Sequence, residues 1–316
     1  MTDLTKKIKA FAVEKAGFDL IGISPASLPE LHEKAITQWV DQGFAGSMGY
    51  MVRDGKKRAH PEESLPGARS VISLALNYYH PEDPKPSTPS GKIAKYAYGM
   101  DYHKTIEKKL KALSNFIKTE AGPETAIKSY VDTGPILEKA FAQQSGLGFF
   151  GKNTNVITRE YGSWIFLASL ITDLELDYDK PHLGGCGSCR ICIDACPTSA
   201  LRGNYEIDAR RCIAYLTIES KEEPPQELKS KVGEWAFGCD ICQEVCPYNF
   251  RAKTTRHKEL YPEKKGGSWL EFEKLKEIKN DDEFAEAFQG SPLKRSKLPG
   301  LLRNSRIVLE NQSNVK

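Results

Sequence analysis

Residues 185–197 read GCGSCRICIDACP and residues 237–247 read FGCDICQEVCP, and these two stretches decide the fold of the second half of the chain. The first contains four cysteines in the spacing C-x2-C-x2-C-x3-C, followed by proline, which is typical of bacterial iron–sulfur proteins. The second repeats the C-x2-C-x3-C-P ending, and Cys212 lies between the two stretches. Each [4Fe–4S] cluster takes four thiolates, so the eight cysteines predict two clusters.

The proline at the end of each stretch indicates how the thiolates divide. In two-cluster ferredoxins the cysteine before the proline ligates the other cluster. Here those cysteines are Cys196 and Cys246, so we expect them to be exchanged between the two ligand sets. The predicted first set is Cys186, Cys189, Cys192 and Cys246, and the predicted second set is Cys196, Cys212, Cys239 and Cys242.

Two other uses of cysteine compete with this interpretation. Structural zinc sites use paired C-x2-C knuckles, but zinc requires neither the additional cysteines nor the repeated ending with proline. Disulfides require an oxidising compartment, and residues 1–10 are polar and charged, unlike a signal peptide. Iron–sulfur ligation is therefore favoured over both.

The composition is that of an ordinary soluble globular protein. The 316 residues are 40% hydrophobic and 28% charged, and the formal net charge is +3. The longest apolar run, Trp164–Ile171, is far shorter than the ~18 residues that span a bilayer. We therefore expect a cytoplasmic protein with no membrane segment, and we expect a monomer.

Helical and strand patterns alternate over residues 1–175, which predicts a mixed α/β (α+β) domain. We expect a two-cluster ferredoxin-like module over 176–250 and a short helical, basic segment over 251–316. The expected helices lie at 4–17, 29–42, between Asp101 and Gly122, and at 136–144, 207–217, 270–278 and 282–288. The expected strands lie at 19–24, 70–78, 126–131, 155–158 and 163–172, the last two joined by a turn.

The strand at 126–131 runs directly into Asp132-Thr133-Gly134-Pro135, and two interpretations of this junction are open. Asp132 or Thr133 can simply cap the following helix, with Pro135 in its first turn. Alternatively, the Asp132 carboxylate is held at the strand end and points into a crevice where a ligand lies.

A glycine-rich loop at 148–154 contains Lys152 and Asn153. It departs from the P-loop pattern, because its glycine spacing is shorter and Asn153 follows the lysine. Such a loop can still bring backbone N–H groups close to an anionic or amide-rich cofactor.

Basic residues gather near the end of the sequence. The stretch from Ser291 to Arg306 contains no acidic residue. A solvated face and a phosphate-binding surface are both open interpretations of this pattern. The five basic residues are Lys294, Arg295, Lys297, Arg303 and Arg306.

Two clusters in a chain of this length imply a second redox site. A ferredoxin alone needs far fewer than 316 residues, so the α/β domain is expected to hold the site that the electrons serve. No side chain here accepts low-potential electrons, so that site must hold an organic cofactor or a metal macrocycle.

An ordered set of motifs resembles the epoxyqueuosine reductase family over nearly the whole chain. DTGP followed by GKNT and then the cysteine module is the specific part of this resemblance. The set comprises Lys57-Arg58, LPGA at 65–68, YAYGMDYH at 96–103, DTGP at 132–135, GKNT at 151–154, the eight cysteines and Arg303-Asn304.

The resemblance implies a cobalamin in the α/β domain, two [4Fe–4S] clusters, and reduction of epoxyqueuosine to queuosine at the wobble base of tRNA. It also implies kinship with reductive dehalogenases, which share this cofactor set. Longer family members continue into a helical-repeat domain after the Arg-Asn segment, where this sequence has only Ser305–Lys316.

The resemblance also assigns roles to residues. Asp132 matches the proton donor that is needed when the opening epoxide develops negative charge on oxygen. Arg58, Lys152 and Asn153 are candidate hydrogen-bond donors to cobalamin or to the substrate anticodon. On composition alone, the alternative for each of them is a surface residue. The five basic residues between Ser291 and Arg306 are the predicted contacts to tRNA phosphates, and an unidentified low-potential donor is expected to supply electrons.

Two other classes of protein are considered against this prediction. One is a reductive dehalogenase-like enzyme that acts on a small molecule, which would be expected to carry an export signal and to need no basic tail. The other is a ferredoxin-type electron carrier, which would not bind cobalamin.

Overall fold

The computed structural model describes residues 1–55, 57–203 and 205–314. Within these, the chain forms two compact units, and neither is one continuous segment. The first unit contains residues 1–43, 49–77 and 103–188. The second contains residues 44–48, 78–102 and the chain from 189 onward.

A four-stranded sheet organises the first unit. Its order is β1 (Leu20–Pro25), β2 (Ser70–Asn77), β7 (Ile165–Thr172) and β4 (Ile127–Tyr130). All three strand pairs are antiparallel, and β2 pairs with β7 along its whole length. Every residue of β2 is buried, as its apolar sequence predicts for a central strand covered on both faces.

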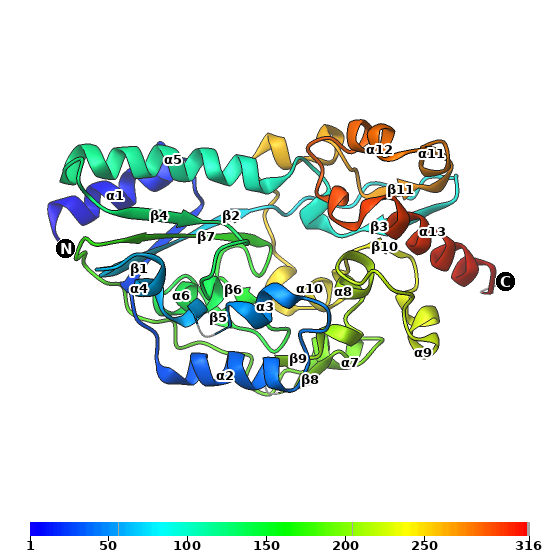
Figure 1. The fold of residues 1–316 in the computed structure, drawn as a ribbon, viewed down its shortest axis with the longest axis horizontal. Helices are drawn as coiled ribbons and strands as arrows, with labels where there is room; N and C mark the ends of the chain where they lie inside the picture. Colours follow the sequence, from blue (N-terminus) through cyan, green and yellow to red (C-terminus); the bar gives the residue numbers. More distant parts are fainter. Residues whose placement is uncertain (56, 204, 315–316) are drawn as a thin grey trace. The chain divides into compact units, whose positions relative to one another are not determined.

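Helices cover both faces of this sheet (Figure 1). The helices α1 (Asp3–Glu14) and α5 (Tyr102–Ala121) lie on one face, and α2 (Glu30–Asp41), α4 (Pro61–Ser64) and α6 (Glu138–Gln144) lie on the other. α6 packs directly on β1, β2 and β7. The approach is so close that a Cβ at Gly22 would lie 2.1 Å from the backbone oxygen of Ser145, so only glycine fits there.

Several predicted elements of this unit are confirmed. The helices at 4–17, 29–42 and after Asp101 and the strands at 19–24, 70–78 and 126–131 are present within a few residues. The strands expected at 155–158 and 163–172 are present as β6 (Val156–Ile157) and β7, and β6 pairs with β5 (Phe149–Phe150). Only an isolated bridge joins Thr158 to Gly162.

A three-stranded sheet and a long helix form the core of the second unit. The sheet order is β10 (Trp235–Phe237), β3 (Ser90–Ile93) and β11 (Trp269–Glu271). Helix α13 (Lys297–Asn314) packs on β10 and β3 through buried apolar side chains that include Leu301 and Val308. Residues 78–102 belong to this unit because β3 is its central strand.

The cysteine-containing segments of this unit are short. Helices α7 (Ile191–Ala195) and α10 (Ile241–Glu244) contact each other, and α8 (Ile213–Ile218) follows Cys212 directly. The prediction that Cys212 lies within a helix over 207–217 was wrong, because Cys212 has extended backbone and occupies the N-cap. The prediction of a single helix over 270–278 was also wrong, since β11 occupies its beginning.

The remaining elements are short. They are α3 (Gly49–Arg53), β8 (Leu201–Gly203), β9 (Glu206–Ile207), α9 (Gln226–Lys229), α11 (Phe272–Lys276) and α12 (Asp281–Ala287). The compact units cut across the expected division into 1–175, 176–250 and 251–316, because 44–48 and 78–102 group with the cysteine module. Residues 315 and 316 of the last expected segment lie outside the described residues.

Candidate active site

Asp132 is at the centre of an unusual turn that follows β4. The amide of Thr133 donates to the carbonyl of Val131 at 2.5 Å, which is the hydrogen bond of a γ-turn. Asp132 has φ +57°, so this is the rarer, strained form of that turn. A strained non-glycine backbone costs about 1–3 kcal/mol and persists only where its surroundings hold it.

This geometry rules out the interpretation of Asp132 or Thr133 as a plain helix cap. Helix α6 begins at Glu138, and its N-cap is Leu137, which makes no side-chain capping bond. Pro135 therefore lies before the helix rather than in its first turn. The turn itself is packed tightly, since a Cβ at Gly134 would lie 2.3 Å from the ring of Tyr130.

Glu138 holds the turn from inside the protein. Its Oε2 accepts a hydrogen bond from the Asp132 amide at 3.1 Å. Burial and, to a smaller extent, the nearby Asp132 carboxylate raise the pKa of Glu138, while the Asp132 amide, Arg58 and His103 act in the opposite direction, and the net pKa is about 8. A buried acid with such a pKa beside an exposed acid is typical of functional sites.

Arg58 supports the same turn from a 3₁₀ turn at Lys57–Ala59. Its guanidinium donates to the carbonyl of Gly134 at 2.9 Å, and its own carbonyl accepts from the amide of Leu137 at 2.8 Å. Arg58 is 7% exposed, so the alternative that it is a surface residue was wrong.

Two buried polar atoms at this turn, Nε of Arg58 and Oε1 of Glu138, have no hydrogen-bond partner in the part of the chain that the structure describes. Such atoms are costly unless another group satisfies them. A polar group bound within hydrogen-bonding distance would satisfy them.

The Asp132 side chain itself faces outward, with 65% of its surface exposed. Its Oδ2 lies 3.6 Å from Nε2 of His103, which makes an ion pair when the imidazole is protonated. His103 comes from the start of α5, so three separate elements meet at this acid.

The GKNT loop is tied to α6 and to the first cysteine. Lys139 of α6 donates to the carbonyl of Thr154 at 2.9 Å. The Lys152 amide donates to Sγ of Cys186 at 3.4 Å, and its ammonium group donates to the carbonyl of Gly187 at 2.8 Å. Asn153 is 3% exposed, and its Oδ1 accepts from the amide of Asn155. For Asn153, too, the surface alternative was wrong.

Residues 146–151 match the letters G-x-G-x-x-G, but their context differs from that of a dinucleotide site. The match follows helix α6 and leads into β5. A dinucleotide site requires the glycines to join a strand to a helix. The loop therefore gives no support to nicotinamide or flavin binding.

A surface pocket of about 400 Å³ lies beside the turn, between α5 and β4. Tyr130, Val131 and Thr133 line its sheet side, and Leu110 and Lys111 are among the α5 residues that line the other. Thr133 connects this pocket to the turn that carries Asp132.

The cysteines of the second predicted ligand set lie near one another. Burial raises the pKa of both Cys239 and Cys242. The thiols of Cys212 and Cys196 raise that of Cys242 further, as does Cys192, a member of the first predicted set. A cluster metal deprotonates such thiols on binding. None of the eight cysteines, all of which the structure describes, forms a disulfide.

Backbone amides point at cysteine sulfur in both units. Besides the Lys152 bond to Cys186, the Ala200 amide donates to Sγ of Cys196 at 3.3 Å. Hydrogen bonds of this kind stabilise cluster thiolates and tune their reduction potential. The sulfur surroundings therefore fit iron–sulfur ligation.

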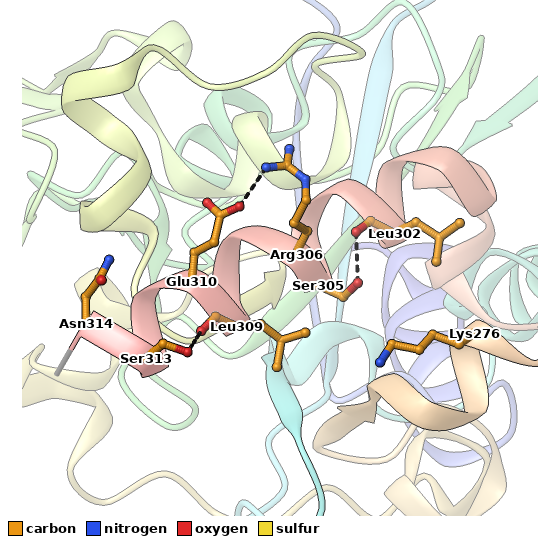
Figure 2. A pocket seen from close by; sticks show the side chains of 8 residues that line it. All are labelled: Lys276, Leu302, Ser305, Arg306, Leu309, Glu310, Ser313 and Asn314. Carbon is orange, nitrogen blue, oxygen red and sulfur yellow. Dashed lines mark hydrogen bonds and ion pairs between the residues drawn. The ribbon is translucent and has the colours of Figure 1, made fainter. Parts of the chain in front are cut away.

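The basic residues near the end of the chain differ in whether they pair with acidic residues of the protein. Arg295 forms a bidentate ion pair with Glu219, and Arg306 pairs with Glu223. Arg306 also pairs with Glu310, as Figure 2 shows. Lys294 and Lys297 are exposed. Figure 2 also shows a surface pocket of about 730 Å³ along α13, lined by residues that include Arg306 and Lys276.

Arg303 and Asn304 form a clamp inside the second unit. Arg303 donates to the carbonyls of Leu216, Ser220 and Glu222, each at 2.7 Å, near the C-terminal end of α8. Asn304 is 1% exposed and donates to the carbonyls of Thr217 and Ala236. These carbonyls include the ones that a helix end leaves unsatisfied.

We therefore expect Arg303→Ala to destabilise the protein by about 2–4 kcal/mol, because it leaves several carbonyls without a donor. Arg306→Ala is the matched control on the same helix, with an expected loss of at most about 1 kcal/mol for its exposed ion pairs. Urea unfolding of the cluster-loaded protein measures both. Equal stability losses in the two variants would contradict a structural role for Arg303.

Glu138 is the functional residue that sequence reasoning missed. A signal was available, because Phe141 and Ala142, three and four residues later, are apolar and share its helix face. An acidic residue on an otherwise apolar face is unusual and often marks a site. His103 was also left without a role.

Membrane spanning is tested by helix length and hydropathy. Among the described residues, no helix combines the length and the apolar character needed to cross a bilayer.

Two sequence-family models match the chain. The model described as "Epoxyqueuosine reductase QueG, DUF1730" matches residues 58–133, which contain Arg58, His103 and Asp132. The model described as "4Fe-4S double cluster binding domain" matches residues 185–249. The second match contains all eight cysteines, so the interpretation of the cysteine spacing as iron–sulfur ligation is confirmed.

Known proteins resemble the chain over nearly its full length. An epoxyqueuosine reductase of Leadbetterella byssophila is 44% identical over 98% of this chain and 100% of its own length. An epoxyqueuosine reductase crystallised with a tRNA-Tyr stem loop that carries epoxyqueuosine is 31% identical, with a TM-score of 0.89 over 98% of this chain and 81% of that one.

A third relative is the Bacillus subtilis epoxyqueuosine reductase, in a structure with its catalytic aspartate loop swung out of the active site. It is 31% identical, with a TM-score of 0.88 over 97% of this chain and 82% of that one. Identities of this size across almost the entire sequence confirm the resemblance carried by the sequence motifs. The chain belongs to the epoxyqueuosine reductase family.

Proposed function

We propose that this chain reduces epoxyqueuosine to queuosine in tRNA, with cobalamin bound in the first unit and two [4Fe–4S] clusters supplying electrons. The observation that carries the proposal is the strained turn that presents Asp132. It displays an acid to solvent while buried groups of the same unit hold its backbone. The family's activity requires a proton donor at the opening epoxide.

The residues around the turn fit a ligand with many polar groups. Nε of Arg58 and Oε1 of Glu138 are buried without partners among the described residues, and Asn153 is buried in the nearby loop. Cobalamin carries amides and a phosphate that can satisfy such groups. When bound, it supplies the low-potential chemistry that no side chain can provide.

Asp132 is proposed to give a proton to the epoxide oxygen as the C–O bond breaks. Its exposed carboxyl can reach a substrate, and bound substrate would exclude water from it. Exclusion of water disfavours the charged form of an acid and so keeps the proton available. His103 is placed to exchange a proton with Asp132 between turnovers.

The eight cysteines would hold two [4Fe–4S] clusters, which would supply single-electron transfer from an external low-potential donor. The ligand sets are those expected from the two prolines, with Cys196 and Cys246 exchanged. Cys212 and Cys196 lie close enough to Cys242 to raise its pKa, as the second set requires, but Cys192 of the first set does so as well, so this proximity does not separate the two sets. The expected location is the cytoplasm, where thiols stay reduced.

Lys294 and Lys297 are the proposed phosphate contacts for tRNA, because both are exposed and Arg303 is committed to backbone carbonyls. We expect Lys294→Gln with Lys297→Gln to weaken tRNA binding and to flatten its dependence on salt. The expected change in the slope of log K against log salt is about 0.7–0.9 for each lost contact.

Lys6→Gln is the matched control, since Lys6 is an exposed lysine of the first unit. Its salt slope should equal that of the unmodified chain. If the double variant has the same slope of log K against log salt as the unmodified chain, the start of α13 and the turn before it are a solvated face and do not bind tRNA phosphates.

Cobalamin binding tests the cofactor part of the proposal directly. The cluster-loaded chain is mixed with cobalamin, separated from unbound cofactor by gel filtration, and examined by its visible spectrum. We expect about one cobalamin per chain to elute with the protein. Elution of the protein with iron but without cobalamin would contradict the proposal and favour an electron carrier.

A further inference from the structure

Hydrogen bonds from the backbone, from Arg58 and from Glu138 hold the Asp132 turn. The contact to Asp132 itself differs, because it is made by a side chain that can gain or lose a proton. Glu138 Oε2 accepts the Asp132 amide at 3.1 Å, six residues along the chain. The acceptor is fixed at the first residue of α6, which packs on the sheet.

We propose that Glu138 is a positioning residue that holds Asp132 in its left-handed turn, and that loss of the Glu138 proton releases this turn. The proposal rests on the proposed function of Asp132 as proton donor. It goes beyond that function because it assigns to Glu138 the orientation of the Asp132 proton donor.

The backbone of Asp132 explains why a holding contact is needed. With φ +57°, the residue is in a conformation that L side chains rarely adopt, and it stays there only if its surroundings stabilise it. The neighbouring Gly134 is fixed by Arg58 on one side and by the Tyr130 ring on the other. At Asp132, the Glu138 carboxyl provides the corresponding contact.

The charges around Glu138 decide how the contact responds to pH. The groups that face it are the Asp132 carboxylate from the turn, the Arg58 guanidinium from the 3₁₀ turn, and His103 from α5. Burial outweighs the two basic groups, and the pKa of Glu138 rises to about 8 from an ordinary value of 4.5. In the closed form, in which Glu138 holds the Asp132 turn, the Glu138 carboxyl group is therefore favoured in its protonated state.

The sign of the pH effect follows from this difference. When the turn opens, Glu138 becomes solvated and its pKa returns toward 4.5, so the open form binds the proton less tightly than the closed form. The equilibrium constant for opening of the turn therefore increases as the pH rises from about 4.5 to about 8, by at most about tenfold for each pH unit. Above about pH 8 the effect levels off.

A movable loop of this kind has a counterpart in the family. The Bacillus subtilis relative has a structure with its catalytic aspartate loop swung out of the active site. Movement of the loop to a second position is therefore compatible with this fold. Glu138 would set the balance between the two positions in this chain.

Hydrogen exchange of the full, cluster-loaded chain tests the proposal without using turnover. Exchange is followed by mass spectrometry on the peptide that contains residues 131–137, between pH 6 and 9, and corrected for the intrinsic rate. In the unmodified chain we expect protection of this peptide to fall as the pH approaches 8. Glu138→Gln keeps an oxygen acceptor but cannot ionise, so its protection should not change with pH.

Glu138→Ala removes the acceptor, and we expect exchange of the same peptide to be about tenfold faster or more at pH 6. Turnover should fall in parallel, and Glu138→Gln should recover most of it. Glu63→Ala is the matched control, an exposed glutamate of α4 in the same unit, and it should change neither quantity.

The same pH dependence in Glu138→Gln as in the unmodified chain would overturn the proposal. Unchanged exchange in Glu138→Ala would overturn it equally. If Glu138→Ala does not fold, the pH comparison with Glu138→Gln decides alone. Activity of Asp132→Asn tests the proton-donor role independently, so a failure there is distinguishable from a failure of Glu138 as the holding group.

Discussion

Asp132→Asn is expected to lower turnover by about 10²–10⁴-fold, the range that a positioned general acid contributes. Asparagine has nearly the same shape, and it keeps the backbone amide that donates to Glu138. It cannot give a proton to the epoxide oxygen, so the C–O bond would break without neutralisation of the charge that develops. Single-turnover reduction of epoxyqueuosine in tRNA, followed by nucleoside analysis, measures this loss.

The structure provides a control for this experiment. Asp41→Asn changes an exposed aspartate at the end of α2 and should have the turnover of the unmodified chain. Iron content, cobalamin binding and far-ultraviolet circular dichroism should be the same in both variants. Full activity in Asp132→Asn would remove Asp132 from the reaction.

The second large effect concerns the cluster ligands. Cys242→Ala should lose one [4Fe–4S] cluster, which is about half of the iron, and with it nearly all turnover, because the electron path is interrupted. Cys196→Ala should have the same effect if Cys196 belongs to the same ligand set. Iron and acid-labile sulfide, measured per chain after anaerobic reconstitution, quantify the loss.

Double variants test the exchange of the cysteines before the prolines. If Cys196 and Cys242 share a cluster, the double variant at these positions should keep about half of the iron, as each single variant does. The double variant of Cys186 and Cys196 should lose nearly all of it. The opposite pattern, with half of the iron kept by the Cys186 and Cys196 pair, would show that no exchange takes place.

The sequence predicts the cysteine chemistry well because ligand spacing is a local property. Four thiolates within eleven residues and a repeated ending leave few alternatives, and the match of residues 185–249 to a double-cluster domain confirms this. The strands of the first unit are also predictable, since β2 and β7 are continuous apolar runs. Their order and antiparallel pairing depend on distant contacts that no local pattern contains.

The candidate site was predictable only in part, because the roles of its residues depend on a helix boundary and on burial, which are properties of the folded chain. Asp132 is marked by the DTGP motif, but the choice between a cap and a functional acid depends on where α6 begins. That boundary lies at Glu138, well after the γ-turn at residues 131–133. The role of Glu138 depends on burial and on the Asp132 amide, which are properties of the folded unit.

For the basic residues near the end of the chain, the sequence predicts more binding residues than the described part of the fold leaves exposed and unpaired with glutamates or carbonyls. A run of cations predicts a binding surface, but charge patterning does not reveal which cations the fold itself uses. Arg303 satisfies three carbonyls, and Arg295 and Arg306 pair with glutamates that are distant in sequence. Only the tertiary structure separates these from Lys294 and Lys297.

We propose that this chain opens the epoxide of epoxyqueuosine in tRNA with electrons from two clusters and with a bound cobalamin. The most direct test is nucleoside analysis of epoxyqueuosine-containing tRNA after incubation with the reconstituted chain, cobalamin and a low-potential reductant. We expect conversion to queuosine, and we expect it to require the chain, cobalamin and the reductant together. Epoxyqueuosine left intact under these conditions, by a chain that carries both clusters and cobalamin, would contradict it.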